Sequence, residues 1–203
     1  MESVRQHWEN IYLQKDFEQL GWYQAEPAME LEWIGSPQED QPLIDIGAGC
    51  AFLADQLAAK GFEQATFVDL SQAALDKIQA RLGERAPKFR MVQGNILDLP
   101  LHGRYRFWHD RAALHFLTDP AQQQMYMNQV RKVLLPGGRV MLAGFAPDGP
   151  EQCSGLPVVR HSLQSLSALL GEEFSLIDQR PWLHRTPGGT EQRYLFTLWQ
   201  RQP

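Results

Sequence analysis

The sequence has little cysteine, no long apolar run and no excess of basic residues. Its two cysteines, Cys50 and Cys153, lie 103 residues apart in a chain of 203, which excludes a disulfide framework and a paired-cysteine metal site. No stretch of 18 apolar residues occurs and the N-terminus has no apolar signal core, so we expect a cytoplasmic protein with no membrane span. Nineteen lysines and arginines against 24 acidic residues give a net charge of −5, so no nucleic-acid partner is expected.

Internal repeats and metal-ligand spacings are also absent, and the six histidines are scattered, so we expect no metal. What the sequence does have is a hydrophobic fraction of 43%, with six tryptophans and ten phenylalanines, which is enough for a core. The length indicates one domain with at most a small addition. We expect a helical and aromatic N-terminal arm over residues 1–41, acting as a lid, and a main domain over residues 42–203.

Short apolar strands alternate with helical patterns in the first part of the main domain. The expected strands are 42–46, 65–68, 88–93, 105–108 and 139–145. Ser71 is the expected N-cap of one intervening helix, and Asp119-Pro120 is a strong start for another. Such alternation predicts right-handed βαβ units and therefore a parallel sheet.

The C-terminal part follows a different pattern. Ser162 is the expected cap of a leucine-rich helix, and two strands follow at about 175–183 and 193–200. Pro187-Gly188-Gly189 lies between these strands and is typical of a hairpin turn. The sequence therefore predicts an α/β fold with an antiparallel hairpin at one edge of the parallel sheet.

A glycine turn follows the first strand. Gly47 and Gly49 stand between that strand and the next helix, where glycine lets the backbone pass close to a ligand. Asp69 lies 22 residues after Gly47, at the end of the second strand, where a carboxylate can accept both ribose hydroxyls of a nucleoside. The combination predicts a nucleoside cofactor.

Two residues favour one cofactor over another. A dinucleotide site requires glycine at the sixth position of the motif, where this chain has Phe52. Asp45 is poorly placed beside a pyrophosphate but suits an ammonium group. S-adenosylmethionine (SAM) carries an α-ammonium and a sulfonium and no phosphate, so the residues favour SAM over NAD.

Further motifs fit this interpretation in order and spacing. They are Asp45-Ile46-Gly47-Ala48-Gly49, Asp69-Leu70-Ser71, Gly94-Asn95-Ile96, Trp108-His109-Asp110-Arg111 and Leu135-Pro136-Gly137-Gly138. On these motifs the chain resembles the class I SAM-dependent methyltransferases over residues 40–145. Segments such as His7–Tyr12 and Cys153–Pro157 make it similar to small stand-alone bacterial members. The resemblance implies a Rossmann-like, seven-stranded, mostly parallel sheet with a reversed last hairpin and helices on both faces.

The resemblance also implies a set of cofactor-binding residues. It gives Asp45, Gly47 and Gly49 to the methionine part, Asp69 to the ribose, Leu70, Asn95 and Ile96 to the adenine, and Trp22, together with Tyr23, to an aromatic lid. The chain departs from the family at two points. Cys50-Ala51 stand where a third glycine is usual, and Asn95 replaces the aspartate that often contacts the adenine amino group. The amide oxygen of Asn95 can still accept that hydrogen bond.

Candidate catalytic residues gather near the fourth strand. His109, Asp110 and Arg111 stand where it is expected to end, and His115 would share a helix face with Arg111 if a helix began there. One hypothesis is a polar cluster that faces the substrate, with His109 or His115 as proton acceptor. The alternative is an Asp–Arg ion pair that braces the loop beside a structural histidine. The proline- and glycine-rich segment 145–157 is expected to be a lid or substrate loop, with Cys153 either a small residue without chemistry or a reactive thiol.

The sequence thus predicts a SAM-dependent methyltransferase, acting as a monomer or homodimer on either a small-molecule or a protein side-chain acceptor. Two alternatives remain open at this stage. One is a SAM-binding regulatory module without turnover, and the other, disfavoured by Phe52 and Asp45, is an NAD-dependent oxidoreductase.

Overall fold

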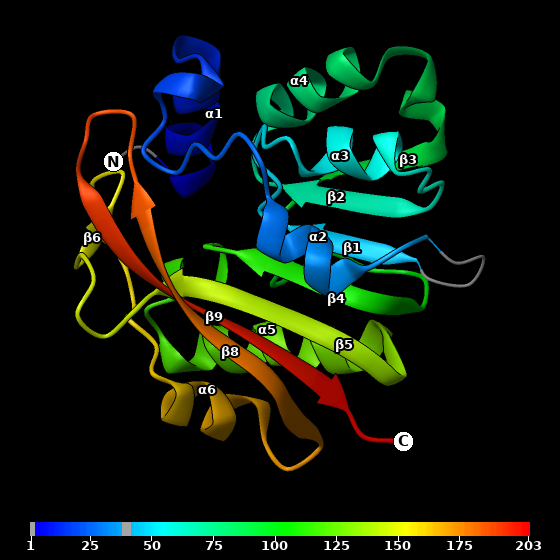
Figure 1. The fold of residues 1–203 in the computed structure, drawn as a ribbon, viewed down its shortest axis with the longest axis vertical. Coiled ribbons are helices and arrows are strands. Elements are labelled where there is room, and N and C mark those ends of the chain that lie inside the picture. Colours follow the sequence, from blue (N-terminus) through cyan, green and yellow to red (C-terminus); the bar gives the residue numbers. More distant parts are fainter. Residues whose placement is uncertain (1–2, 38–41) are drawn as a thin grey trace.

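The computed structural model describes residues 3–37 and 42–203 and is built on a seven-stranded sheet. Its strands are β1 (Leu43–Ile46), β2 (Ala65–Asp69), β3 (Phe89–Gln93), β4 (Tyr105–Arg111), β5 (Leu134–Phe145), β8 (Phe174–Arg185) and β9 (Glu191–Arg201). They lie in the order β3-β2-β1-β4-β5-β9-β8 (Figure 1). The first five pair in parallel, whereas β9 is antiparallel to both β5 and β8. The predicted mostly parallel sheet with a C-terminal antiparallel hairpin is confirmed.

Helices cover both faces of this sheet (Figure 1). One face packs against α2 (Ala28–Ile34), α3 (Leu53–Ala59) and α4 (Gln72–Leu82), and the other against α5 (Pro120–Val133) and α6 (Leu163–Leu170). Each strand contributes side chains to both faces of the sheet, because successive side chains point in opposite directions. In β1, Leu43 joins the first cluster, while Ile44 and Ile46 join the second. The sheet therefore separates two hydrophobic cores.

A third hydrophobic cluster attaches the start of the chain to the rest. It combines buried side chains of α1 (Val4–Gln14) and of the 3-10 helix η1 (Phe17–Gln19) with residues at the N-terminal ends of α3 and α4. Tyr12 and Phe17 are buried in it beside Cys50. The arm thus packs against the main domain. The expected boundary after residue 41 falls at the end of segment 38–41, which lies outside the described residues.

The predicted helix starts are confirmed. The side chains of Ser71, Asp119 and Ser162 each accept a hydrogen bond from a backbone N–H in the first turn of α4, α5 and α6. The predicted ends of two strands are wrong, since β4 continues past Trp108 to Arg111 and β5 starts at Leu134. Pairing between these two long parallel neighbours extends both.

Short elements that the periodicity did not predict complete the fold. They are the 3-10 helices η2 (Gly83–Lys88) and η3 (Leu114–Phe116) and a separate two-stranded ribbon of β6 (Gln152–Cys153) and β7 (Leu156–Pro157). Within residues 3–37 and 42–203, no helix is long and apolar enough to cross a membrane.

Candidate functional site

A cleft of about 490 Å³ lies at the carboxyl ends of β1, β2 and β4. In the sheet, β1 lies between β2 and β4. The chain adds β2 and β3 on one side of β1 and then returns to add β4 and β5 on the other side, so the strand order reverses at β1. Ligands of open α/β sheets bind at such reversals. The volume is within the range of about 300–1,000 Å³ that is typical of small-molecule sites. The cleft is therefore the first candidate for a functional site.

The predicted glycine turn forms the base of this cleft. Gly47 and Gly49 have φ angles of +66° and +55°, a region that side chains with a Cβ disfavour. A Cβ on Gly47 would lie 2.7 Å from the Cβ of Ala113, and a Cβ on Gly49 would lie 2.6 Å from the hydroxyl of Tyr12. The two glycines thus allow the loop after β1 to lie close to both the loop after β4 and helix α1.

Asp69, at the end of β2, is held in one orientation beside the cleft. One carboxylate oxygen accepts a hydrogen bond from the N–H of Gly49 and the other from the N–H of Ser71, each at 2.8 Å. Burial raises the pKa of Asp69 to about 6, although these two hydrogen bonds act in the opposite direction. The carboxylate is therefore positioned by the glycine turn and titrates at mildly acidic pH.

The residues that the sequence placed at the adenine line the same cleft. Leu70, Asn95 and Ile96 all contribute to its wall. The side-chain oxygen of Asn95 already accepts a hydrogen bond from the N–H of Leu97 at 3.1 Å. An amide oxygen has two lone pairs, so this oxygen can accept a second hydrogen bond.

Aromatic side chains of the arm form the opposite wall. Trp8, Tyr12 and Trp22 line the cleft, and Trp8 makes edge contacts with Trp22 and with Phe116 of η3. Tyr23, which was predicted to form the lid together with Trp22, is not among the residues that line the cleft. Its ring packs against Phe17 and Phe52. Trp8 lies in the segment His7–Tyr12 that carries part of the resemblance, whereas Phe116 is a cleft residue that no motif singled out.

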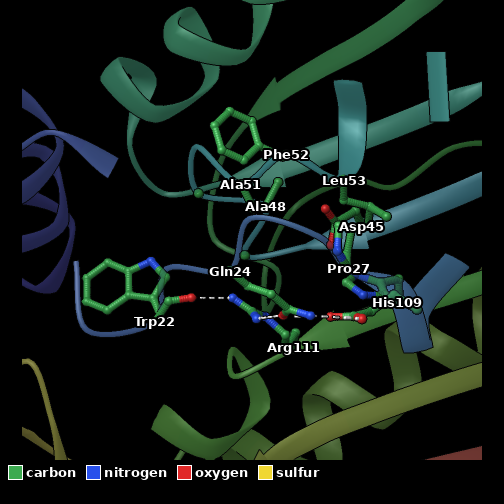
Figure 2. Close-up of a pocket in the computed structure, with 13 residues that line it drawn as sticks. Trp22, Gln24, Pro27, Asp45, Ala48, Ala51, Phe52, Leu53, His109 and Arg111 are labelled. Carbon is green, nitrogen blue, oxygen red and sulfur yellow. Dashed lines mark hydrogen bonds and ion pairs between the residues drawn. The ribbon is translucent and has the colours of Figure 1, made fainter. Parts of the chain in front are cut away.

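A small compartment of about 40 Å³, lined by both polar and apolar residues, adjoins the cleft and shares Trp22, Gly47 and Arg111 with it (Figure 2). Its other lining residues include Asp45, His109, Gln24 and Glu30. Asp45 accepts a hydrogen bond from Nδ1 of His109 at 2.6 Å. Sequence reasoning gave Gln24 and Glu30 no role in the site, because no spacing connects these arm residues to a strand that begins 75 or more positions later.

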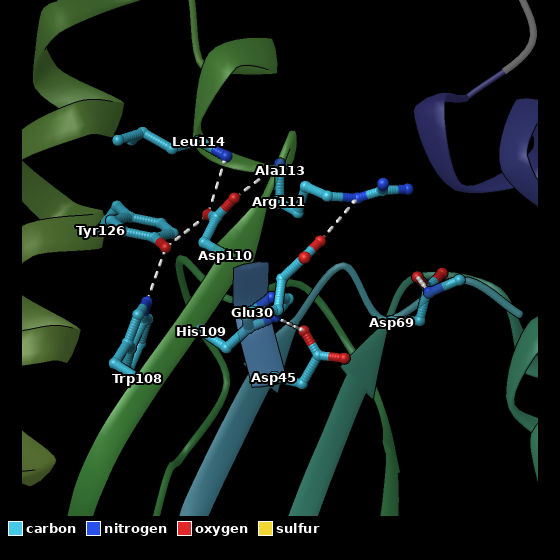
Figure 3. Close-up of polar contacts among 11 residues, drawn as sticks. Glu30, Asp45, Asp69, Trp108, His109, Asp110, Arg111, Ala113, Leu114 and Tyr126 are labelled. Carbon is cyan, nitrogen blue, oxygen red and sulfur yellow. Dashed lines mark hydrogen bonds and ion pairs between the residues drawn. The ribbon is translucent and has the colours of Figure 1, made fainter. Parts of the chain in front are cut away.

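Strand alternation separates the predicted catalytic cluster (Figure 3). His109 and Arg111 face the compartment, whereas Asp110 points to the opposite face of the sheet. There it accepts hydrogen bonds from the N–H groups of Ala113 and Leu114, at 2.8 and 2.9 Å, and from the hydroxyl of Tyr126. Asp110 is fully buried, and burial raises its pKa to about 6. It braces the turn after β4 through these bonds rather than through an ion pair with Arg111.

His115 does not share a helix face with Arg111, because β4 runs through Arg111 and only the short η3 follows. Its ring packs against Phe116 and Phe145 and is 2% exposed. Neither ring nitrogen has a hydrogen-bond partner among the residues that the structure describes. Burial lowers the pKa of His115 to about 3, so the imidazole is neutral at ordinary pH.

The predicted loop 145–157 contributes one residue to the cleft. Cys153, in β6, lines the wall, and burial raises the pKa of its thiol to about 12. The thiolate form is thus strongly disfavoured at this position. Among the described residues, no group of three or more His, Cys, Asp or Glu side chains could hold a metal ion.

Comparisons with known proteins agree with this geometry. Residues 43–138 match the family described as "Methyltransferase domain". Curated relatives include an O-methyltransferase, cnsE, of Penicillium expansum, 27% identical over 127 residues, which cover 61% of this chain and 44% of that protein. Another is an eEF1A lysine and N-terminal methyltransferase of Mus musculus, 25% identical over 68% of this chain and 20% of that protein. The chain thus spans less than half the length of the curated relatives it matches.

Solved structures match nearly the whole fold. A structure concerned with the conversion of a disulfide bond into a thioacetal group during echinomycin biosynthesis has a TM-score of 0.76, with 16% identity, 98% of this chain and 92% of that chain covered. The glycopeptide N-methyltransferase MtfA complexed with SAM has a TM-score of 0.64, with 18% identity over 87% and 92% of the two chains. At these identities the likeness concerns the fold. Residues 43–138 thus match a methyltransferase domain, and this match and the fold together support a class I, Rossmann-like, SAM-dependent methyltransferase.

Proposed function

We propose that this chain binds SAM along the base of the cleft and transfers its methyl group to a small-molecule acceptor that enters the same cleft. The observation that carries the proposal is the cleft itself. It combines a fixed carboxylate, Asp69, with an aromatic wall from the arm, within a volume suited to a small ligand. When bound, SAM supplies an electrophilic methyl group on a sulfonium.

The residues present fit this cofactor. Asp69 offers a buried carboxylate for the ribose hydroxyls, and Leu70, Asn95 and Ile96 offer a wall for the adenine. Gly47 and Gly49 have no Cβ, so their loop can lie close to Ala113 and to Tyr12. Trp22 lies where the cleft meets the small compartment, so its ring can cover the sulfonium region, where aromatic faces attract cations.

The acceptor end of the cleft is largely apolar. Trp8 and Phe116 pack edge to face there, beside Val4 and Leu117. Arg5 and Gln122 add polar groups to the lining. This surface favours a compact, mostly apolar acceptor over a flexible, strongly hydrated ammonium group. A protein side chain is the second candidate, because one curated relative is described as a lysine and N-terminal methyltransferase.

We propose that catalysis depends on positioning and on exclusion of water rather than on a protein base. His115 is neutral but enclosed by Phe116 and Phe145, and it is not among the residues that line the cleft. Asp110 is engaged on the other face of the sheet. Holding two reactants in an attack geometry contributes up to about 7–11 kcal/mol in favourable cases. The predicted roles of His115 and Asp110 as catalytic groups are therefore replaced by structural ones in this proposal.

An extract-labelling assay tests the proposed function. Purified protein is incubated with SAM carrying a labelled methyl group and a cell extract, which is then separated into protein and small-molecule fractions. The proposal expects enzyme-dependent label in the small-molecule fraction, with the label lost in the Asp69→Asn variant. Label confined to protein would favour the second candidate. No enzyme-dependent label in either fraction, despite SAM binding, would support a binding module without turnover.

A further inference from the structure

The lining of the cleft includes a cation that has no partner. Among the described residues, the charged side chains that line the cleft are Arg5, Asp69 and Arg111. Asp69 accepts hydrogen bonds from two backbone N–H groups, and Arg111 donates to the backbone oxygen of Trp22. Arg5, in contrast, is exposed and has no hydrogen bond or ion pair with any other described residue. Its guanidinium is therefore free to pair with a ligand.

Helix α1 places Arg5 at the opposite end of the cleft from the proposed cofactor site. Tyr12, on the same helix, lies close to the glycine turn. Arg5 stands seven residues earlier, so its backbone lies about 10 Å farther along the helix axis. Between them is Trp8, which makes edge contacts with Trp22 and with Phe116. The wall that α1 contributes thus runs from the glycine turn, past a group of aromatic rings, to a guanidinium.

No carboxylate of α1 balances this charge. Glu9 follows Arg5 by four residues, a spacing at which an ion pair can form on a helix. Its carboxylate instead accepts hydrogen bonds from the hydroxyl of Ser71 and the N–H of Ala73. The first turn of α1 contains no acidic residue. The charge of Arg5 is therefore left for a group outside the helix.

A second polar group comes from α5. Gln122, near the start of that helix, lines the cleft and has no hydrogen-bond partner among the described residues, whereas the amide of Gln123 donates to the backbone oxygen of Leu117 at 2.8 Å. A side-chain amide offers two N–H donors and a guanidinium offers five. Val4 and Leu117 add apolar surface to the same lining. Unpaired donors on an apolar wall favour a ligand that combines an apolar body with a negatively charged group.

We infer that the methyl acceptor is a compact, ring-containing molecule that carries an anionic group, a carboxylate or a phosphate, and that Arg5 determines specificity by pairing with this group. The inference deepens the proposed function and rests on it. The planar fork of arginine suits both anions, because it can donate two parallel hydrogen bonds. Trp8 and Phe116 offer ring faces and edges for the body of the acceptor. The anionic group is thus an anchor, and the atom that receives the methyl group lies at the other end of the acceptor, toward Trp22.

Fractionation of the extract by charge tests this inference. The small-molecule fraction is divided on anion- and cation-exchange resins at pH 8 before it is incubated with the protein and labelled SAM. We expect the acceptor in the fraction that the anion exchanger retains. Phosphatase treatment of that fraction then distinguishes a phosphate anchor, which would be removed, from a carboxylate, which would not.

Variants of Arg5 show whether this residue reads the charge. Methylation rates are measured against the amount of the retained fraction. We expect Arg5→Gln to raise the half-saturating amount about three- to tenfold, as for loss of one partly exposed charged pair. The maximal rate and the affinity for SAM should stay within about twofold. Arg5→Lys should recover part of the loss, because it keeps the charge without the fork. Arg104→Gln, the matched control, removes the same charge from an exposed position just before β4 and should change nothing.

The possible outcomes separate this inference from the proposed function. Added salt should raise the half-saturating amount for the wild type more than for Arg5→Gln, because salt screens an exposed ion pair. An acceptor found in the unretained or cation-exchange fraction, or equal behaviour of Arg5→Gln and Arg104→Gln, would overturn the inference while methylation of a small molecule stood. If no small-molecule fraction became labelled, the proposed function itself would fail, and the inference with it.

Discussion

His109 and Asp110 are neighbours on β4, but their side chains lie in different environments and are expected to have different roles. Successive side chains of a strand point to opposite faces, so His109 faces the small compartment and Asp110 faces the core beneath α5. The sequence shows the two as one polar motif. The fold gives one of them a position that faces the compartment and the other a bracing position, and substitutions at the two should therefore differ in effect.

The bracing position predicts a stability effect without a binding effect. The Tyr126 hydroxyl donates to Asp110 and accepts from Nε1 of Trp108 at 2.7 Å. Tyr126→Phe leaves a buried indole N–H unpaired and removes one bond to the carboxylate, so we expect the free energy of unfolding to fall by about 1–3 kcal/mol. Urea denaturation measures it. Affinity for S-adenosylhomocysteine (SAH) should stay within about twofold, and an unchanged unfolding midpoint would contradict the bracing role.

The raised pKa of Asp69 predicts that nucleoside binding weakens in acid. Below a pH of about 6 the free protein carries a protonated Asp69, which loses charge as a hydrogen-bond acceptor. Because binding favours the ionised carboxylate, affinity for methylthioadenosine should fall progressively as the pH drops through 6. Calorimetry between about pH 5 and 8 measures this, and Asp69→Asn should flatten the profile. A profile that persists in that variant would assign the titration to Asp110, whose pKa is also about 6.

Among the elements, helix α1 is hydrogen-bonded to the start of α4 through the side chain of Glu9. A carboxylate oxygen of Glu9 accepts from the hydroxyl of Ser71 at 2.7 Å and from the N–H of Ala73 at 3.3 Å. The N–H of Ser71 donates in turn to Asp69. The first turn of α4 therefore connects the arm to the proposed ribose acceptor, and α1 presents Trp8 and Tyr12 to the cleft from the same helix.

Loosening this connection should free the arm. Glu9→Gln removes the charge that favours the N-terminus of α4 and weakens the bond to Ser71. We expect faster hydrogen exchange in residues 4–14 and SAH binding weakened about three- to tenfold. Glu18→Gln, an exposed change of the same kind on the same arm, is the control and should alter neither. Equal exchange in the two variants would show that Glu9 does not hold α1 in place.

The close packing of Gly47 in the glycine turn can be tested by comparison with Gly61, whose φ angle is also positive. Gly47 and Gly61 both have positive φ, but a Cβ meets Ala113 at 2.7 Å only on Gly47, and it meets nothing within 4 Å on Gly61. We expect Gly61→Ala to cost about 1–2 kcal/mol for the left-handed conformation alone. Gly47→Ala should cost more and should also weaken SAH binding. If thermal melts showed equal losses, the contact with Ala113 would have no consequence.

At the scale of the whole molecule, local patterns predicted the sheet well and the site only in part. Alternating strands and helices, the caps at Ser71 and Asp119, and the Pro-Gly-Gly turn are encoded in consecutive residues, so the fold was accessible from the sequence. Gln24 and Glu30 reach Arg111 across more than 80 positions, and no periodicity encodes such a contact. Likewise, Arg111 and His115 do not share a helix face, because pairing with β5 extends β4 through Arg111.

The arm and the main domain form one ligand-binding structure in this account, since the cleft and the compartment both take residues from each. The most direct test is a crystal structure of the chain with SAH. The account predicts the ribose hydroxyls on Asp69, the adenine against Leu70 and Ile96, and the sulfur beside the ring of Trp22. A ribose bound away from Asp69, or an adenine bound outside the cleft, would contradict it.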